Sequence, residues 1–485
     1  MKRLLIIILF ISAIPMLFSQ TSSDALRYSR ILYDGSARFQ GLGGAIGAVG
    51  GDFSSIATNP AGLGLYTSSE FTISPYLRME NSLSNFNMET NRDNNLNIGM
   101  ENLGLVFHIS GNDKSSSAFK GFNFGFGMNR QNDFNNRVFM EGTNNKNSLL
   151  KEYVDILNNT PGGITPQMIN DQYPFDIALA YNNNLIFLDT VNHRYKNDAP
   201  NGGLIQSKTV TTEGSINEYD FAFGINYNDR LYIGATIGIP VIRYSECTQY
   251  QEIKNDTAVH YFKSMTFNQQ LETHGTGINL KVGLIYRPAD WLRIGAAIHT
   301  PTYYGNMRDN WSSDMTGELD FASNSASSPL GSFDYQLITP FRAIGSVVFI
   351  IGKFGLVSGE YEYVNYSRSR FSADNASFSD VNADIKNKYK SPVNVRFGTE
   401  WRIQKFRLRG GFSYYGSPYQ SSISTSEMYI ASIGWGYRAK HFFVDMAYQW
   451  TQTKEDYYFY DPVYVDPSQN TYHTGTITTT VGLRF

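Results

Sequence analysis

The chain has 485 residues and a formal net charge of −3, a balance that gives no reason to expect a nucleic-acid partner. Only 17% of its residues are charged, against about 25% in an average soluble domain, while 15% are aromatic. The single cysteine, Cys247, excludes an internal disulfide. These features leave an aromatic-rich chain whose compartment has to be inferred from other signals.

The first residues have the pattern of a targeting segment. Lys2 and Arg3 precede an apolar run from Leu4 to Leu17, and Ser19 is a small residue at a plausible cleavage point. The run is short for a membrane helix, and polar residues follow it from Gln20. We expect residues 1–19 to be a signal peptide, so that the remaining chain is exported.

A glycine-rich segment follows, reading GSARFQGLGGAIGAVGGDFSSIATNPAGL from Gly35 to Leu63. Its many glycines make it a poor helix and a poor strand, and its compact apolar residues suit close packing inside another structure. Asp52 and Asn59 can hydrogen-bond their own backbone and fix tight turns, with Pro60 next in sequence. Two interpretations remain at this point: a surface loop, or a hatch (residues 20–68) that packs inside the structure formed by the rest of the chain.

From Phe71 onward, apolar and polar residues alternate. Segments such as Leu103–Ser110 and Gly121–Arg130 each have one apolar face and one polar or glycine-rich face, as half-buried strands do. Later segments pair through short links, for example Gln404-Lys405, whereas long polar stretches separate the pairs. Short turns at one end and long loops at the other are typical of an outer-membrane β-barrel.

Counting the segments predicts an all-β fold, a transmembrane antiparallel barrel of 14 strands over residues 69–485. The four longest polar stretches, Ser245–Gly275, Tyr303–Asp334, Ser367–Ser391 and Thr453–Thr474, are expected to be outer loops. Leu149–Leu157 and Pro174–Leu188 have helical spacing instead. We therefore expect residues 131–215 to form one large extracellular loop with two helices.

A charged group is expected on the lumen side of two neighbouring strands. With a two-residue turn between them, Glu400 faces Arg409 and Arg402 faces Arg407. One interpretation is a solvated rim of the lumen. The other is that these arginines, together with Arg396, bind carbonyl or carboxylate groups of the hatch.

At this point the chain resembles a known family. The signal peptide, the segment ARFQGLGGAIGAVGGDFSSIATNPAGL and the alternating strands are similar to the FadL/TodX family of outer-membrane transporters for hydrophobic compounds, as are TPFRAIGSV, LRGGFSYYGSPY and the terminal TTTVGLRF. The resemblance implies a hatch inside the barrel. The residues that match its glycine turn, its NPA motif and the neighbouring hatch positions are Gly41, Gly43, Gly44, Asp52, Asn59, Pro60, Ala61 and Gly62.

The resemblance also implies a function: passive uptake of long-chain fatty acids or aromatic hydrocarbons across the outer membrane of a Gram-negative bacterium, through a lumen pocket and a lateral exit. The expected partners are the hydrophobic ligand, outer-membrane lipid and lipopolysaccharide, and the barrel-assembly machinery, with the protein a monomer. Relatives that serve as secretion scaffolds or haemin receptors leave two alternatives, the latter through His193 with Tyr195 or His260 with Tyr261. No nucleophile or metal-binding motif occurs, so no enzyme activity, metal or cofactor is expected.

Overall fold

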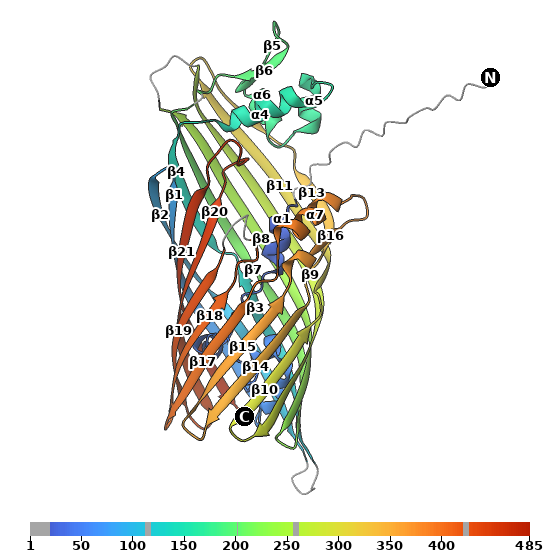
Figure 1. Ribbon diagram of the computed structural model, residues 1–485, viewed down its shortest axis with the longest axis vertical. Coiled ribbons are helices and arrows are strands. Elements are labelled where there is room, and N and C mark those ends of the chain that lie inside the picture. Colours follow the sequence, from blue (N-terminus) through green and yellow to red (C-terminus); the bar gives the residue numbers. More distant parts are fainter. Residues whose placement is uncertain (1–19, 112–117, 201, 256–260, 421–425) are drawn as a thin grey trace, which may run out of the picture.

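The computed structural model describes residues 20–111, 118–200, 202–255, 261–420 and 426–485, and the expected signal peptide lies outside this range. Nineteen strands form one antiparallel sheet that closes through the pairing of β1 with β21. Figure 1 shows the result, a tilted barrel with short turns at its lower end. No helix in the described part of the chain is long and apolar enough to cross a membrane.

Fourteen strand positions make up the closed wall. Their order around the barrel follows the chain: β1 (Glu70–Phe86), β2 (Glu89–Ser110), β3 (Phe119–Asp133), β7 (Leu204–Tyr227), β8 (Leu231–Lys254), β9 (Phe262–Ala289), β10 (Leu292–His299), β14 (Arg342–Ile351), β15 (Gly355–Val364), β17 (Asn394–Ile403), β18 (Phe406–Tyr415), β19 (Met428–Arg438), β20 (Phe442–Tyr457) and β21 (Ser468–Arg484). The predicted 14-stranded barrel is confirmed.

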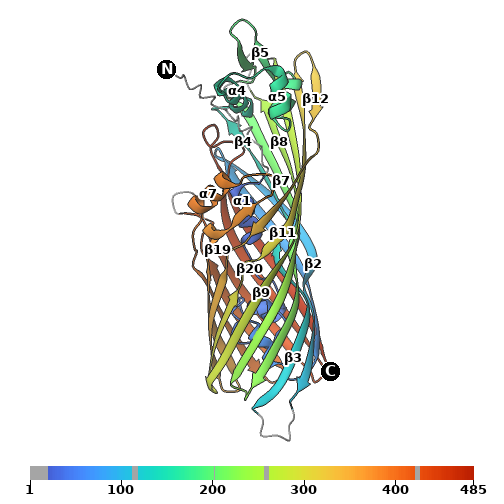
Figure 2. The ribbon, with the colours of Figure 1, turned by 90° about the vertical axis from the view of Figure 1, so that its right-hand side faces the viewer.

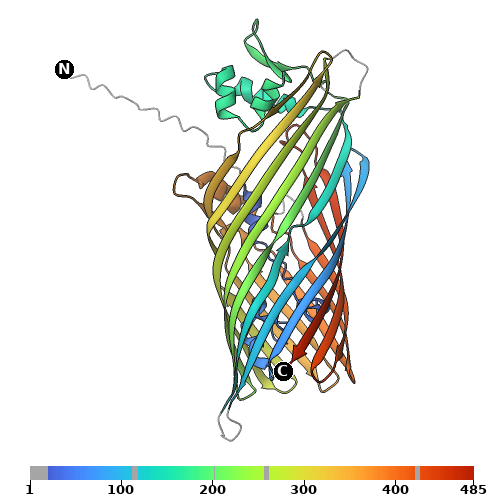
Figure 3. The same ribbon diagram turned by 180° about the vertical axis from the view of Figure 1, so that it is seen from behind.

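The remaining five strands of the sheet extend or flank these positions. They are β4 (Asn136–Asn144), β11 (Tyr303–Leu319), β12 (Ser323–Ser327), β13 (Gly331–Ile338) and β16 (Arg370–Ser372). β11 follows β10 after a break and, like β10, pairs with β9. β13 likewise extends the position of β14, because it pairs with β11. The wall is therefore much taller on the side of β7, β8, β9 and β11 than elsewhere, as Figure 3 shows from behind.

This extension corrects two of the expected loops. Most of Ser245–Gly275 belongs to β8 and β9, and most of Tyr303–Asp334 belongs to β11, β12 and β13. Toward the long-loop end, these strands extend beyond the zone in which their outer face is apolar. There, both faces of a strand can be polar, so the sequence no longer alternates although the backbone ladder continues.

The segment expected as one loop with two helices is also more ordered. Residues 136–144 form β4 and residues 204–215 belong to β7, so both pair into the sheet. Between them lie three helices, α4 (Leu149–Asn159), α5 (Pro166–Gln172) and α6 (Ile177–Asn182), and a small hairpin of β5 (Ile186–Asp189) and β6 (Arg194–Asn197). Their apolar faces pack on the tall part of the wall in one buried cluster that includes Leu150, Leu157 and Met315. They cap the long-loop end in Figure 2.

The chain before β1 forms small elements: α1 (Ser22–Ser29), α2 (Ala37–Gly41), α3 (Ser55–Thr58) and the 3₁₀ helix η1 (Pro60–Leu65). We call residues 20–66 the N-terminal segment. Nearly all of its side chains are buried, and its contacts reach wall strands on opposite sides of the barrel, β7, β8 and β9 through η1 and β18 to β21 through α2. A further helix, α7 (Ser379–Lys388), and a short 3₁₀ turn, η2 (Tyr366–Arg368), lie beside α1.

The two faces of the wall differ in chemistry. Outward positions carry large exposed apolar side chains, among them Phe221, Phe223, Ile233, Leu284, Ile294, Trp435 and Leu483. The inward positions between them are small or polar, such as Ala222, Thr236 and Gly283. In water, so large an exposed apolar surface would be unfavourable. The protein therefore has an outside suited to a lipid environment and an inside suited to contact with the N-terminal segment.

Candidate functional site

The predicted glycine turn ends α2. Gly43 and Gly44 have φ angles of +59° and +76°, in the left-handed region that glycine adopts without strain. A Cβ at Gly43 would lie 2.7 Å from the amide nitrogen of Phe412 in the wall. The hydroxyl of Ser413 donates to the carbonyl of Gly43 over 2.6 Å. The turn therefore requires glycine for its backbone conformation and also makes direct contact with β18. Gly41, two residues before Gly43, packs against Gly434 of β19.

Asp52 organises the interior of the N-terminal segment. Its carboxylate accepts a hydrogen bond from the Ser36 hydroxyl at 2.7 Å and from the Ser54 amide at 2.9 Å. The Ser54 hydroxyl in turn accepts from the Asn102 side chain of β2 at 2.9 Å. Asp52 therefore joins the two halves of the segment and connects them to the wall.

The NPA motif, Asn59-Pro60-Ala61, contacts β9, on the side of the barrel opposite the glycine turn at β18. The Asn59 side-chain amide donates to the carbonyls of Gly47, at 2.6 Å, and of Leu284 in β9, at 3.3 Å. Its oxygen accepts from the Ala61 amide at 3.2 Å and so caps η1, which begins at Pro60. Asn59 is 1% exposed and has both ends of its amide engaged.

Ala61 and Gly62 complete the motif by their small size. Ala61 is fully buried against Tyr232 and Ile285 of the wall. A Cβ at Gly62 would lie 2.5 Å from the Ser55 hydroxyl, so only glycine fits there without displacing the α3 turn.

Wall glycines receive the motif, and the sequence analysis did not identify them as site residues. A Cβ at Gly283 would lie 1.9 Å from the Asn59 side-chain oxygen, and one at Gly234 would lie 2.3 Å from the Pro60 carbonyl. Gly411 and Gly398 make equally close approaches to Gly43 and Leu42. The signal was present in the sequence, because these glycines fall on the inward positions of their strands.

The charged group predicted on β17 and β18 pairs as expected across the two strands, with Glu400 opposite Arg409 and Arg402 opposite Arg407. Neither of the two interpretations of this group holds as stated. Arg396 and Arg409 are buried and do not form a solvated rim. The hydrogen bonds and ion pairs of the group's arginines go to the wall and not to carbonyls or carboxylates of the hatch. Arg409 binds the wall carboxylates Glu400, at 2.9 Å, and Asp445, at 2.8 Å. Arg407 donates to carbonyls of its own turn, and Arg402 is partly exposed and 3.5 Å from Glu400.

Arg396 also pairs within the wall, with Glu360 at 2.6 Å and with Glu362. Its guanidinium lies 5.2 Å from the ring centroid of Tyr33 in the N-terminal segment, and its side chain packs beside Gly44. The physical reason is that a fully buried guanidinium needs a carboxylate partner more than a carbonyl, and the neighbouring strand supplies two. The wall carboxylates are what bind the segment: Glu400 accepts from Arg38 at 3.1 Å, and Glu360 accepts from the Gly47 amide at 2.8 Å.

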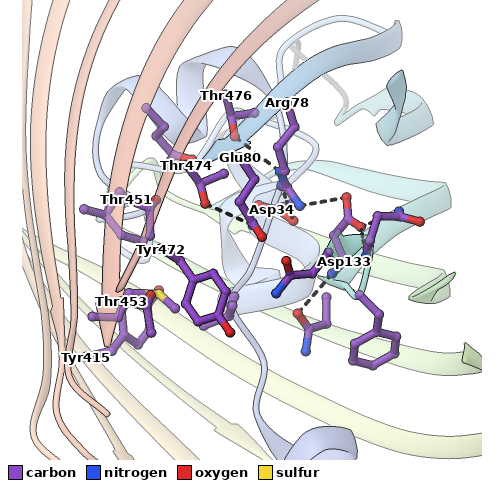
Figure 4. Close-up of a pocket in the computed structure, with 18 of the residues that line it drawn as sticks. Asp34, Arg78, Glu80, Asp133, Tyr415, Thr451, Thr453, Tyr472, Thr474 and Thr476 are labelled. Carbon is purple, nitrogen blue, oxygen red and sulfur yellow. Dashed lines mark hydrogen bonds and ion pairs between the residues drawn. The ribbon is translucent and has the colours of Figure 1, made fainter. Parts of the chain in front are cut away.

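A cavity of about 390 Å³ lies in the lumen between the N-terminal segment and the long-loop end. Figure 4 shows part of its lining, with Arg78, Glu80 and Asp133 projecting from the wall and Asp34 from the N-terminal segment. The cavity has a size typical of small-molecule sites. Tyr415 lines the cavity, whereas Tyr361 and Tyr363 of β15 point outward and are 46% and 41% exposed.

One border of this cavity is a seam in the wall. The backbone ladder between β2 and β3 ends at the Asn102–Asn129 pair. Beyond that point, side chains bridge the β1–β2 hairpin to β4: Ser84 donates to the Phe139 carbonyl at 2.7 Å, and Asn91 donates to the Glu141 carbonyl at 2.8 Å. All the hydrogen bonds that the structure shows across the seam among the described residues involve a side chain, and none joins two backbone groups. Side chains can move away individually, so the seam is more easily opened than a continuous backbone ladder.

A compact ionic network lies where the seam meets the cavity. Asp133 accepts from Arg78 at 2.7 Å, from Arg130 at 2.9 Å and from the Tyr76 hydroxyl at 2.7 Å. Arg78 also pairs with Asp34 of the N-terminal segment at 3.3 Å. The network therefore connects both edges of the seam to the segment inside the lumen.

A second cavity, of about 860 Å³, lies at the short-turn end below the N-terminal segment. Its charged lining is mostly arginine, namely Arg38, Arg287, Arg293, Arg402, Arg407, Arg438 and Arg484, against Asp52, Glu70, Asp290 and Glu400. Arg293 donates to the Val49 carbonyl at 2.9 Å, and Arg342 of β14 donates to the Ser29 carbonyl. These wall arginines make the contact with segment carbonyls that the sequence analysis considered for other arginines.

The haem alternative finds no support at His193 and Tyr195. Tyr195 is buried and its hydroxyl donates to the Ile164 carbonyl at 2.7 Å, so it is not free to ligate. His260 lies outside the described residues. Within the described part of the chain, no group of His, Cys, Asp and Glu residues is placed to hold a metal ion.

The arrangement just described, a closed 14-stranded barrel with an N-terminal segment among its inward side chains, defines a class of β-barrel fold. Solved structures share it. A Pseudomonas aeruginosa FadL homologue matches with a TM-score of 0.56 at 12% identity, covering 94% of this chain and 100% of that chain. The Pseudomonas putida toluene transporter TodX matches with a TM-score of 0.54 at 11% identity, covering 94% and 100%.

The CymD monoaromatic hydrocarbon channel matches with a TM-score of 0.51 at 13% identity, covering 93% of this chain and 98% of that chain. No family model matches the sequence, and no curated protein matches it. This chain therefore has the fold of the FadL and TodX channels, at an identity that supports the fold alone.

Proposed function

We propose that this protein is an outer-membrane channel for passive uptake of hydrophobic small molecules, the class that contains long-chain fatty acids and aromatic hydrocarbons. The observation that carries the proposal is a lumen cavity of about 390 Å³ between the N-terminal segment and the long-loop end, inside a barrel with an apolar exterior. Burying apolar surface there is favourable by about 25 cal/mol per Å². The FadL-type fold supports the proposal, and the N-terminal segment acts as its hatch.

The proposed route out of the cavity is lateral, through the seam between β2 and β3–β4. The seam borders the cavity at Asp133 and Asn135, and outside it Leu96 and Ile98 are 60% and 78% exposed. A hydrophobic molecule that leaves this way enters lipid directly and avoids water. An axial route would require it to pass the buried hatch and the arginine-lined cavity beneath it.

A reversible cross-link across the seam tests this route. Asn97 and Asn135 lie on its two edges, with the Asn97 side-chain amide 3.5 Å from the Asn135 backbone carbonyl. In a Cys247→Ser background, Asn97→Cys with Asn135→Cys is joined by a short thiol cross-linker that reductant cleaves. We expect uptake of a radiolabelled fatty acid and of toluene to fall on cross-linking and to recover on reduction.

The matched control is Gln249→Cys with Asn268→Cys, a pair already adjacent across the continuous β8–β9 ladder. Cross-linking it leaves uptake unchanged. Equal uptake with the seam locked would contradict the lateral route. No difference in uptake between cells with and without the protein would contradict the channel function itself.

A further inference from the structure

The lumen cavity has a polar side made by three neighbouring strands. β1, β21 and β20 place inward side chains in register, with Glu80 opposite Thr474 and Thr474 opposite Thr451. Thr474 donates to one oxygen of Glu80 at 3.2 Å, a bond visible in Figure 4. The other Glu80 oxygen is buried and has no hydrogen-bond partner among the described residues. A buried carboxylate oxygen without a donor is costly, and this Glu80 oxygen has no donor from the protein among the described residues.

Glu455 continues the same polar side. It lies on β20 two inward positions beyond Thr451, beside Thr453, and the Tyr472 hydroxyl lies 3.4 Å from its carboxylate. No cation lies within ion-pair distance of Glu80 or Glu455 among the described residues. The two arginines that line the cavity are already paired, Arg78 with Asp34 and Asp133, and Arg27 with Asp24 and Glu246.

The charge balance of the lining is therefore negative. Its acidic members are Asp34, Glu80, Asp133, Glu246 and Glu455, and its basic members are Arg27 and Arg78. Arg30 stands behind the lining, with its guanidinium 3.5 Å from the Ser426 carbonyl. After the paired groups are set aside, Glu80 and Glu455 remain as acidic side chains that line the cavity without an ion-pair partner among the described residues.

The opposite side of the cavity is apolar. It is made by aromatic and aliphatic side chains from the N-terminal segment, from β4, β7 and β8 and from the link between β3 and β4, namely Leu32, Phe39, Phe134, Val138, Val210 and Tyr244. Met428 and Ile430 of β19 add an apolar edge directly beside Thr453 and Thr451 of the polar side. An elongated molecule with one polar end would find a counterpart for each end. The apolar side favours a hydrocarbon portion, and the polar side favours a donor, above all a cationic one.

We propose that the cavity binds a cationic amphiphile, whose ammonium group lies by Glu80 and Glu455 and whose hydrocarbon part lies against the apolar side. The proposal rests on the channel function above and narrows its ligand class. An ammonium group supplies the donors that Glu80 lacks and balances the two carboxylates. A fatty-acid carboxylate in the same position would be repelled by the two acidic side chains, and it has no hydrogen-bond donor for Glu80. A neutral alcohol supplies one donor and ranks between the two.

Three probes of one chain length test this ranking: octylammonium, octanol and octanoate. Each is radiolabelled and titrated at pH 7 into the protein held in nanodiscs of zwitterionic lipid, with binding to empty nanodiscs subtracted. We expect octylammonium to bind at least about tenfold more tightly than octanoate, the size of one charge-assisted hydrogen bond, with octanol between them. In the double variant Glu80→Gln with Glu455→Gln, this preference falls by about tenfold or more.

Glu272→Gln is the matched control, because Glu272 is an exposed carboxylate on the tall part of β9, away from the cavity. It leaves the preference unchanged. Heat-modifiable migration on gels verifies that each variant is a folded barrel, and the ranking in the unaltered protein needs no variant. Octanoate binding as tightly as octylammonium, or a preference that survives the double variant, overturns the proposal and leaves the channel function standing. Failure of all three probes to bind above empty nanodiscs overturns both.

Discussion

At the scale of single residues, the site depends on close approach between the N-terminal segment and a glycine-bearing wall. Asn59 is the clearest case, since its amide spans the segment and β9 while Gly283 leaves room for it. The sequence analysis predicted the Asn59, Pro60 and Ala61 motif but not its receptor. Inward glycines are visible in the sequence, yet which of them meets the motif depends on the register of the closed barrel.

Asn59→Ala removes the two donated hydrogen bonds and the cap of η1. Each buried bond contributes about 0.5–1.5 kcal/mol, and loss of a cap costs about 1 kcal/mol. We expect the barrel to insert normally while the segment opens more often. Single-channel recordings in planar bilayers measure this as more frequent open events. Asn91→Ala, which removes a bond at the outer seam instead, serves as the control, and an unaltered opening frequency in Asn59→Ala would contradict the role of the motif.

Gly283→Ala tests the receptor side of the same contact. The added methyl would lie 1.9 Å from the Asn59 side-chain oxygen, so the motif has to move away from β9. We expect the same increase in open events, and no further increase when Gly283→Ala is combined with Asn59→Ala, because both act on one contact. The control is Gly359→Ala on the outward face of β15, where the new methyl meets Phe397 at an ordinary 3.7 Å. Additive effects of the two changes would show that they act separately.

At the scale of elements, alternation located all fourteen wall strands but not their full lengths. The alternation of apolar and polar residues is present where one face meets lipid and the other meets the lumen, as in residues 219–227 of β7. It is absent in residues 204–215 of the same strand, where polar residues occur on both faces. The helix at Leu149–Leu157 was predictable because its buried stripe recurs at helical spacing. The ionic network around Asp133 was not, because its members come from β1, β3 and the N-terminal segment.

The helical region at the long-loop end is expected to depend on pH through Asp176, which caps α6. Burial raises the pKa of this carboxyl from its usual 3.8 to about 6, and the hydrogen bond from the Ile177 amide lowers it in part. The folded region therefore retains a proton that the unfolded chain has already released. Its stability is greatest below about pH 4, falls as the pH rises through 6, and levels off above that value.

Hydrogen exchange of residues 149–182 between pH 4 and pH 8, corrected for intrinsic exchange rates, measures this dependence. We expect protection to decrease through pH 6 in the unaltered protein. In Asp176→Asn, which keeps a capping oxygen and cannot titrate, this decrease is absent. Asp155→Asn in α4 is the control, and a pH dependence that persists in Asp176→Asn would contradict the assignment to this group.

At the scale of the whole molecule, the N-terminal segment separates two cavities of opposite character. The charged residues that line the cavity toward the long loops are mostly acidic, and those that line the cavity at the short-turn end are mostly arginines. A cation that reached the first cavity would meet an unfavourable potential on the axial route to the second. The charge distribution therefore supports the lateral route, independently of the gap in the β2–β3 ladder.

Deleting residues 20–66, with the signal segment joined directly to Thr67, tests the segment as the closure of the lumen. A 14-stranded barrel is wide enough to hold water unless something fills it. The segment holds wall strands together through bonds such as Arg38 to Glu400 and Gly47 to Glu360, so the deleted barrel is expected to be less heat-stable. We nevertheless expect it to insert, because the backbone ladder closes without the segment.

Planar-bilayer recordings should then show a large, steady ionic conductance where the full-length protein shows little. The matched control deletes only residues 20–29. This removes α1 and keeps the glycine turn, Asp52 and the NPA motif, and it is expected to conduct far less than the larger deletion. A fully deleted barrel that is heat-modifiable and inserted, yet no more conductive than the intact protein, would show that another part of the chain closes the lumen.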